Sequence, residues 1–244
     1  MLICAPLLAA DRAVLMEQAE ALGGLHPDCV EWRADFFSAL EPKDVPALLE
    51  AVAAAAGVPV LFTNRLLGEG GHVPQQEDRR VAVLAAAAGS GVPALVDVEM
   101  ATAPVLAQRV VDAARRARVA VVRSWHDFSS TPAAAVLLDT LRAMQDAGAD
   151  VAKIAVTPRT PEDVLVLLSA GLEARRTFLE VPSILMAMGK LGAVSRLAGQ
   201  FGSDLTFAAG LHASAPGQMD LMLMRRGLQA LGLADGSSAG GEAS

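Results

Sequence analysis

The chain has no tyrosine, only two cysteines and only three lysines among its 244 residues. Without tyrosine, no tyrosine side chain can act as a general acid. The two cysteines, Cys4 and Cys29, lie in apolar runs, so we expect buried thiols rather than a disulfide or a metal-binding pair. Because lysine is so scarce, a lysine inside an apolar segment is a candidate for chemistry.

Apolar runs long enough to span a membrane are also missing, although 53% of the residues are hydrophobic. Glu50, Ser90-Gly91 and Pro93 interrupt the longest runs, and much of the apolar content is alanine. The N-terminus shows no basic region followed by an apolar run and a small-residue cleavage site. We therefore expect a cytoplasmic protein with no membrane partner.

The net charge of -7 disfavours nucleic acid as a partner, because phosphate binding needs a concentrated basic surface. An acidic small-molecule substrate remains compatible with this charge, since a pocket can be positive locally. The partner we expect is therefore a small molecule.

Short apolar segments recur along the chain and predict eight strands. They are Leu2–Ala5, Cys29–Arg33, Val58–Asn64, Ala94–Glu99, Val119–Ser124, Val151–Val156, Ser183–Met188 and Leu205–Ala209. Segments with helix start and stop signals lie between them, at Arg12–Leu22, from Thr131-Pro132 to Gly148, and from Thr160-Pro161 to about Gly171.

Eight strand–helix units of about 30 residues predict a (β/α)8 TIM barrel. We expect one catalytic domain over residues 1–233 and a disordered tail over residues 234–244, which are small and polar. An open doubly wound sheet is the alternative, but no glycine-rich turn follows the first strand.

The active site of such a barrel lies at the carboxyl ends of its strands. Residues capable of chemistry occur at these positions in this chain. They are Glu31, Arg33, Arg65, Glu69, Asp97, Glu99, His126, Asp127, Lys153, Met186, Met188, Ser214 and Gln218.

Lys153 lies within the apolar strand Val151–Val156, and strand alternation places it on one face with Val151 and Ala155. A dry interior disfavours the charged ammonium form, which makes the neutral amine available as a nucleophile. A lysine paired with a carboxylate fits the strand context equally well. The all-parallel barrel and the scarcity of lysine favour Schiff-base chemistry.

His126 precedes Lys153 by one strand, so we expect both on neighbouring parts of the same rim. An imidazole suits a proton that moves near neutral pH, and Glu69 is a candidate to orient it. Arg196, Arg65 and Arg33 could hold substrate oxygens, Arg196 as a bidentate carboxylate clamp.

These residues lie in motifs that resemble the type I 3-dehydroquinate dehydratase family, in order along the whole chain. The motifs are Glu31-Trp32-Arg33-Ala34-Asp35, Phe62-Thr63-Asn64-Arg65, Glu69-Gly70-Gly71, His126-Asp127-Phe128, Ala147-Gly148-Ala149-Asp150, Lys153-Ile154-Ala155-Val156, Met186-Ala187-Met188-Gly189, residues 192–196, Phe201-Gly202-Ser203 and residues 213–218. Each motif is weak evidence, whereas the ordered set is strong.

The resemblance implies a role for each matching residue. Lys153 would form an imine with the substrate ketone, His126 would be the general acid and base, and Glu69 would hydrogen-bond that histidine. Arg196 would bind the substrate carboxylate. The other implied substrate contacts are Glu31, Arg33, Arg65, Ser214 and Gln218 through polar atoms, and Met186 and Met188 through packing on the ring.

The resemblance implies conversion of 3-dehydroquinate to 3-dehydroshikimate and water in the shikimate pathway. It also implies a homodimer and requires no metal or other cofactor. The sequence departs from the family in beginning at the first strand, without an N-terminal hairpin, and in having Pro6 and Trp125 near the expected pocket.

Three alternative functions are open to the same residues. A class I aldolase would share the barrel and Lys153. A metal-dependent sugar isomerase would use Glu31, Asp97, Glu99 and His126 as ligands. A binding protein would keep the pocket without forming an imine.

Overall fold

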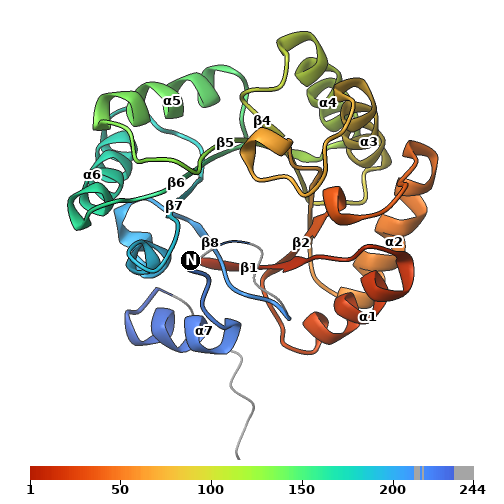
Figure 1. Ribbon diagram of the computed structural model, residues 1–244, viewed down its shortest axis with the longest axis horizontal. Helices are drawn as coiled ribbons and strands as arrows, with labels where there is room; N and C mark the ends of the chain where they lie inside the picture. The colour runs from red at the N-terminus through yellow and green to blue at the C-terminus, as the bar shows by residue number, and fades with distance from the viewer. Residues whose placement is uncertain (212–214, 216, 234–244) are drawn as a thin grey trace, which may run out of the picture.

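The computed structural model describes residues 1–211, 215 and 217–233. Eight strands form one parallel sheet that curls into a barrel, and helices surround it (Figure 1). The strands are β1 (Leu2–Leu7), β2 (Cys29–Arg33), β3 (Val60–Thr63), β4 (Leu95–Glu99), β5 (Ala120–Asp127), β6 (Val151–Val156), β7 (Ser183–Ala187) and β8 (Leu205–Phe207). The predicted (β/α)8 barrel is confirmed.

The outer layer consists mainly of α-helices, each after a strand. They are α1 (Arg12–Gly23), α2 (Val45–Ala56), α3 (Glu77–Ser90), α4 (Pro104–Ala117), α5 (Ala134–Asp146), α6 (Pro161–Thr177) and α7 (Leu221–Ala230). Between β7 and β8 the connection is made by two short 3-10 helices, η4 (Ala193–Leu197) and η5 (Gly199–Phe201). Within the described ranges, no helix is both long enough and apolar enough to cross a membrane.

Seven pairs of neighbouring strands have ladder hydrogen bonds, from β7 through β1 to β8. The remaining seam, between β7 and β8, is held by isolated hydrogen bonds instead of a ladder. Asp204 N donates to Ser183 O at 2.7 Å, and Leu185 N donates to the hydroxyl of Ser203 at 3.0 Å. The barrel is therefore nearly closed, with its weakest pairing beside the last strand.

Side-chain alternation divides the apolar residues into an interior and an outer core, as strand geometry requires. The interior cluster includes Ala155 and Met186, whereas Ile154 packs outward against α5 and α6 residues. The predicted face that carries Lys153 is thus the barrel interior. Cys4 and Cys29 are buried free thiols in that interior, as predicted.

Two predicted helix boundaries were wrong. Helix α6 continues past Gly171 to Thr177, because this glycine is a packing position rather than a helix end: a Cβ there would collide with Leu185 and the backbone of Phe201. Helix α5 begins at Ala134, two residues after Pro132, so this proline is not its first residue. The predicted tail, residues 234–244, lies outside the described residues.

Candidate active site

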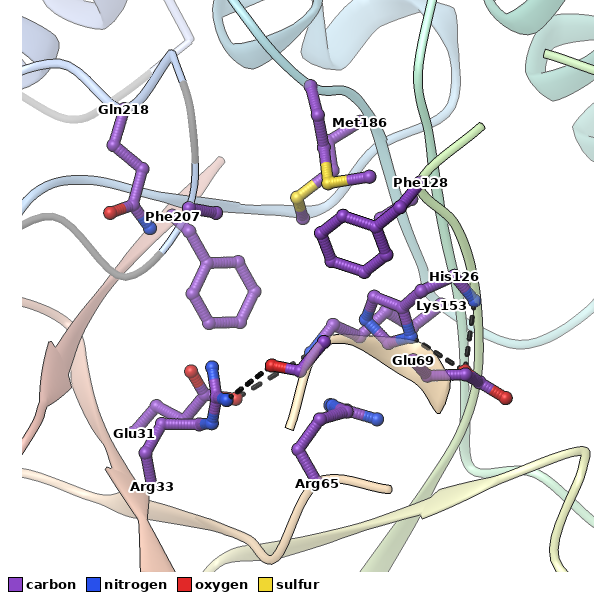
Figure 2. A pocket seen from close by; sticks show the side chains of 14 residues that line it. Glu31, Arg33, Arg65, Glu69, His126, Phe128, Lys153, Met186, Phe207 and Gln218 are labelled. Carbon is purple, nitrogen blue, oxygen red and sulfur yellow. Dashed lines mark hydrogen bonds and ion pairs between the residues drawn. The ribbon is translucent and has the colours of Figure 1, made fainter. Parts of the chain in front are cut away.

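A cavity opens at the carboxyl ends of the strands (Figure 2). It is lined by Glu31, Arg33, Arg65, Glu69, Gly70, His126, Phe128, Lys153, Ala155, Met186, Met188, Phe207, Ala215 and Gln218. Nine of the eleven predicted site residues therefore line this one cavity. Of the other two, Arg196 lies outside the lining, and Ser214 lies outside the described residues.

Lys153 enters the cavity from the middle of β6 with its side chain only 5% exposed. Its Nζ lies 2.9 Å from Oδ2 of Asp97 and 3.7 Å from Oε1 of Glu31. The Phe207 ring covers another side, with its centroid 4.7 Å from Nζ. Lys153 thus pairs with a carboxylate, as one of its two sequence-based interpretations expected, and it also lines the cavity.

Asp97 is fully buried behind Lys153 and does not line the cavity. Arg65 holds it with two hydrogen bonds, Nη1 to Oδ1 at 2.9 Å and Nη2 to Oδ2 at 2.7 Å. The hydroxyl of Ser124 donates to Oδ1 as well. Burial alone would raise the pKa of Asp97, but the charges of Arg65 and Lys153 outweigh it and keep this pKa well below the usual range.

Arg65 also binds a second buried carboxylate. Its Nη1 lies 3.0 Å from Oε1 of Glu99, and Arg80, which comes from α3, reaches Oε2 of Glu99 at 2.7 Å. Burial would lower the pKa of Arg65, but Asp97 and Glu99 raise it above its ordinary value. Arg65 lines the cavity, and its guanidinium hydrogen-bonds these carboxylates and Ser124.

His126 lies inside β5, not after it as predicted, because β5 continues to Asp127. Its Nδ1 is 2.9 Å from Oε2 of Glu69, and its backbone N–H donates to the same oxygen at 3.0 Å. This arrangement favours the tautomer with hydrogen on Nδ1, which leaves Nε2 as a base. The predicted His126–Glu69 contact is present (Figure 2).

The electrostatic environment keeps the imidazole of His126 in its neutral form. Burial lowers its pKa well below the usual range, and the positive charges of Arg65 and Lys153 add to this effect. Burial also raises the pKa of Glu69, to about 7. The imidazole is therefore neutral at neutral pH, and an ionised Glu69 beside it can stabilise the imidazolium that forms on proton uptake.

Polar groups from β2 and β3 form one side of the cavity. Oε1 of Glu31 accepts a hydrogen bond from the hydroxyl of Thr63 at 2.8 Å. Arg33 holds Asp35 through Nε and Nη2, at 2.8 and 2.7 Å, and also donates to Gly70 O at 3.1 Å. Since their partners are buried or backbone groups, these side chains are fixed before any ligand arrives.

Methionine and aromatic side chains form the opposite wall. Figure 2 shows Met186 and Phe128 across the cavity from Glu31, Arg33 and Arg65. This pairing of an apolar wall with fixed polar groups is typical of a small-molecule site. Trp125 packs against the outer core and Pro6 is absent from the lining, so neither shapes this cavity directly.

Arg196 is completely buried next to the cavity wall. Its Nη1 donates to Phe207 O at 3.0 Å and lies 3.9 Å from the sulfur of Met186. Burial lowers the pKa of Arg196 to about 10. Met186 and Phe207 both line the cavity, so the Arg196 guanidinium lies immediately behind the apolar wall.

Several residues of this site were missed or misassigned in the sequence. Asp97 and Glu99 were recognised only as strand-end carboxylates and possible metal ligands, and the structure instead surrounds them with Arg65, Arg80 and Lys153. This cationic surrounding is unfavourable for a metal ion. Alternation along β8 could have revealed Phe207, whereas nothing in the sequence indicates that Arg80 reaches Glu99 from a helix.

Comparison with known proteins gives one consistent result. A sequence model of the family described as type I 3-dehydroquinase matches residues 3–235. A 3-dehydroquinate dehydratase of Aromatoleum aromaticum is 40% identical over 236 residues, which are 94% of this chain and 90% of the relative. One from Geobacillus kaustophilus is 44% identical over 226 residues, or 90% of this chain and 86% of the relative.

Solved structures agree with the sequence comparison. The crystal structure of the Geobacillus kaustophilus 3-dehydroquinate dehydratase superposes with a TM-score of 0.88 at 41% identity and covers 95% of this chain and 91% of that one. A type I 3-dehydroquinate dehydratase from Clostridium difficile, with covalently modified comenic acid, has a TM-score of 0.89 at 34% identity, covering 94% and 91%.

Proposed function

This chain belongs to the type I 3-dehydroquinase family, and we propose from its site that it dehydrates 3-dehydroquinate through an imine on Lys153. The activity is that of a lyase: 3-dehydroquinate gives 3-dehydroshikimate and water. The observation that carries the mechanism is the placement of Lys153 and His126 in one cavity, each with its own carboxylate partner.

The first step is attack of the neutral Lys153 amine on the substrate ketone. The carbinolamine that forms loses water and becomes an iminium ion. Its positive nitrogen withdraws electrons and acidifies the adjacent carbon. Lys153 lies on the cavity floor, where the Phe207 ring and the buried Asp97 limit access of bulk water to the new bond.

The second step is proton transfer by His126. Nε2 takes a proton from the carbon next to the iminium, and the electron pair forms an enamine. The enamine expels the β-hydroxyl, which leaves as water with the proton from His126, and imine hydrolysis releases the product. Glu69 holds Nδ1 throughout, so it orients the ring and balances the imidazolium charge.

Substrate oxygens are held by the polar side of the cavity and by Arg196. We assign Glu31, Arg33 and Arg65, together with Ser214 and Gln218, to hydroxyl and carbonyl contacts, and Met186 and Met188 to the ring face. Arg196 binds the substrate carboxylate. This contact requires the side chains of the adjacent wall to move enough for the carboxylate to reach the guanidinium. The supporting fact is that Arg196 directly adjoins two lining residues, Met186 and Phe207.

The assembly and location follow from the family likeness. We propose a cytoplasmic homodimer that works in the shikimate pathway of aromatic amino acid biosynthesis, with no metal or organic cofactor. Sedimentation velocity at micromolar protein concentration tests the dimer, since a species near 25.2 kDa would contradict it. Full activity after exhaustive chelation is the expected result for a metal-free reaction.

The test of the function is direct turnover. In the product the carbonyl is conjugated with a new C=C bond. Product formation from 3-dehydroquinate therefore raises the ultraviolet absorbance. We expect turnover by the purified chain and none by Lys153→Ala, whose fold is checked by circular dichroism. Near-normal turnover by Lys153→Ala would overturn the imine mechanism.

A further inference from the structure

We propose that Asp97 is the counter-ion of the Lys153 iminium and keeps the imine nitrogen protonated throughout the reaction. This inference rests on the proposed function, because it assigns a role within the imine chemistry of Lys153. It deepens that function by naming the group that preserves the electron-withdrawing form of the intermediate. A neutral imine, without the proton, withdraws electrons too weakly to acidify the adjacent carbon.

Geometry singles out Asp97 for this role. Its Oδ2 lies 2.9 Å from Nζ of Lys153, whereas the nearest oxygen of Glu31 lies 3.7 Å away and already accepts a hydrogen bond from Thr63. Asp97 is fully buried and absent from the cavity lining, whereas Lys153 lines the cavity. The substrate carbon therefore approaches Nζ from the cavity, on the side away from Asp97.

Bond formation leaves the iminium nitrogen with one hydrogen. Nζ of the free ammonium ion has three; one is lost to solvent before attack and a second moves to the ketone oxygen as the carbinolamine forms, whose hydroxyl then takes a proton from solvent and leaves as water. The remaining N–H can point at Oδ2 of Asp97, which needs no rearrangement of β4 or β6. The positive iminium thus keeps the ion pair that the ammonium ion had before reaction.

Arg65 adjusts the strength of this ion pair. Two of its N–H groups bind Asp97, so the carboxylate does not offer its whole charge to Lys153. An unshared carboxylate would hold the ammonium form more firmly and slow the first attack. The low pKa of Asp97, maintained against burial by Arg65 and Lys153, keeps it an anion rather than a proton acceptor.

The charged and titratable groups around Nζ all contribute to any pH dependence. They are Asp97 from β4, Glu31 from β2, Arg65 after β3, His126 from β5 and the thiol of Cys4 from β1. Among the carboxylates in this set, Asp97 is the nearer to Nζ. Its replacement therefore removes the largest stabilising charge from the iminium.

The experiment compares trapping by cyanoborohydride at several pH values in wild type and Asp97→Asn. This reagent adds hydride to the protonated iminium, reducing C=N to a secondary amine, and reacts far more slowly with neutral imine. Without the charge, the N–H proton is lost at lower pH. We expect the pH midpoint of adduct formation to fall by about 1 unit or more, as for loss of an opposite charge at this distance.

Ser124→Ala is the matched control, because it removes a hydrogen bond to the same carboxylate and leaves the charge. Its midpoint should stay within a few tenths of a unit of wild type. An unchanged midpoint in Asp97→Asn would overturn the counter-ion role, since a merely structural role lowers the yield without moving the midpoint.

A second measurement covers the case in which Asp97→Asn does not fold. The wild-type midpoint is compared with that of the imine formed by the same ketone and N-acetyl-lysine amide in solution. A midpoint at least about 1 unit higher in the protein supports the counter-ion, and equal values overturn it. Absence of any wild-type adduct at every pH would instead reject the imine itself, and so identifies failure of the underlying mechanism.

Discussion

Lys153 and His126 lie on adjacent parallel strands, offset by one step along the same face. Ser124 is the register partner of Lys153, and His126 follows two residues later on β5, opposite Ala155. Because side chains alternate along a strand, His126 and Ser124 share the interior face with Lys153. The nucleophile and the base are therefore placed by sheet register, not by a flexible loop.

Replacement of His126 should separate imine formation from dehydration. In His126→Ala we expect turnover to fall by roughly 10²–10⁴-fold, the usual contribution of a positioned acid or base. Lys153 and Asp97 remain in place, so the imine with 3-dehydroquinate should still form and be trapped by borohydride. Intact mass and steady-state rates measure both effects; a variant that neither turns over nor gives an adduct would place His126 in the attack step as well.

Glu69→Gln should change the pH dependence of stability. Burial raises the pKa of Glu69 from 4.5 to about 7, so the folded state holds this proton more tightly than the unfolded state does. The wild type therefore loses stability as pH rises from 4.5 to 7, by on the order of 3 kcal/mol for a shift of this size. Glutamine has no charge to desolvate.

The measurement is urea unfolding of both proteins at pH 4.5 and pH 8. The stability of the variant relative to wild type should increase between these values by on the order of 3 kcal/mol, while turnover falls because the imidazolium loses its partner. Comparing two pH values removes packing effects of the substitution. A difference that does not vary with pH would contradict the assigned protonation of Glu69.

Arg196→Lys tests the carboxylate clamp. A lysine keeps the charge but has no planar fork for bidentate binding, so we expect KM to rise by roughly 10-fold or more with a smaller change in kcat. The control is the melting temperature, because Arg196 also donates to Phe207 O between β7 and β8. An unchanged KM with a lowered melting temperature would make Arg196 a structural residue of the β7–β8 seam.

Gly70 supports the aromatic wall of the cavity. It has a φ of +87°, and a Cβ there would collide with the ring of Phe128. Gly57 has a similar φ of +64° but open space around its Cα, so Gly57→Ala reports the backbone strain alone. We expect about 1 kcal/mol of destabilisation in Gly57→Ala, and in Gly70→Ala a further loss together with a higher KM. Equal effects of the two substitutions on stability and KM would show that the Phe128 contact is unimportant.

Much of this structure depends on sequence patterns within one or two segments, and could therefore be predicted from the sequence. Strand alternation placed Lys153 inside the barrel, and strand order placed His126 beside it; both are properties of one or two segments. The end of α6 was predicted wrongly, because the role of Gly171 depends on Leu185 and Phe201, which are distant in sequence.

Contacts that depend on strand register and helix packing could not be predicted from the sequence. Asp97 reaches Lys153 across β5, and Arg80 reaches Glu99 from α3, and neither distance has a local signature in the sequence. Arg65 was predicted as a substrate contact from its place after a strand. The structure shows that its guanidinium also links Asp97 to Glu99, a relationship that only the assembled barrel reveals.

The most direct test of the whole account is the intact mass of the protein after incubation with 3-dehydroquinate and borohydride. The mechanism predicts a covalent adduct on the wild type and none on Lys153→Ala, with peptide mapping placing the added mass at Lys153. Folded wild-type protein that turns over the substrate but gives no adduct would contradict the imine, and with it the central role assigned to Lys153.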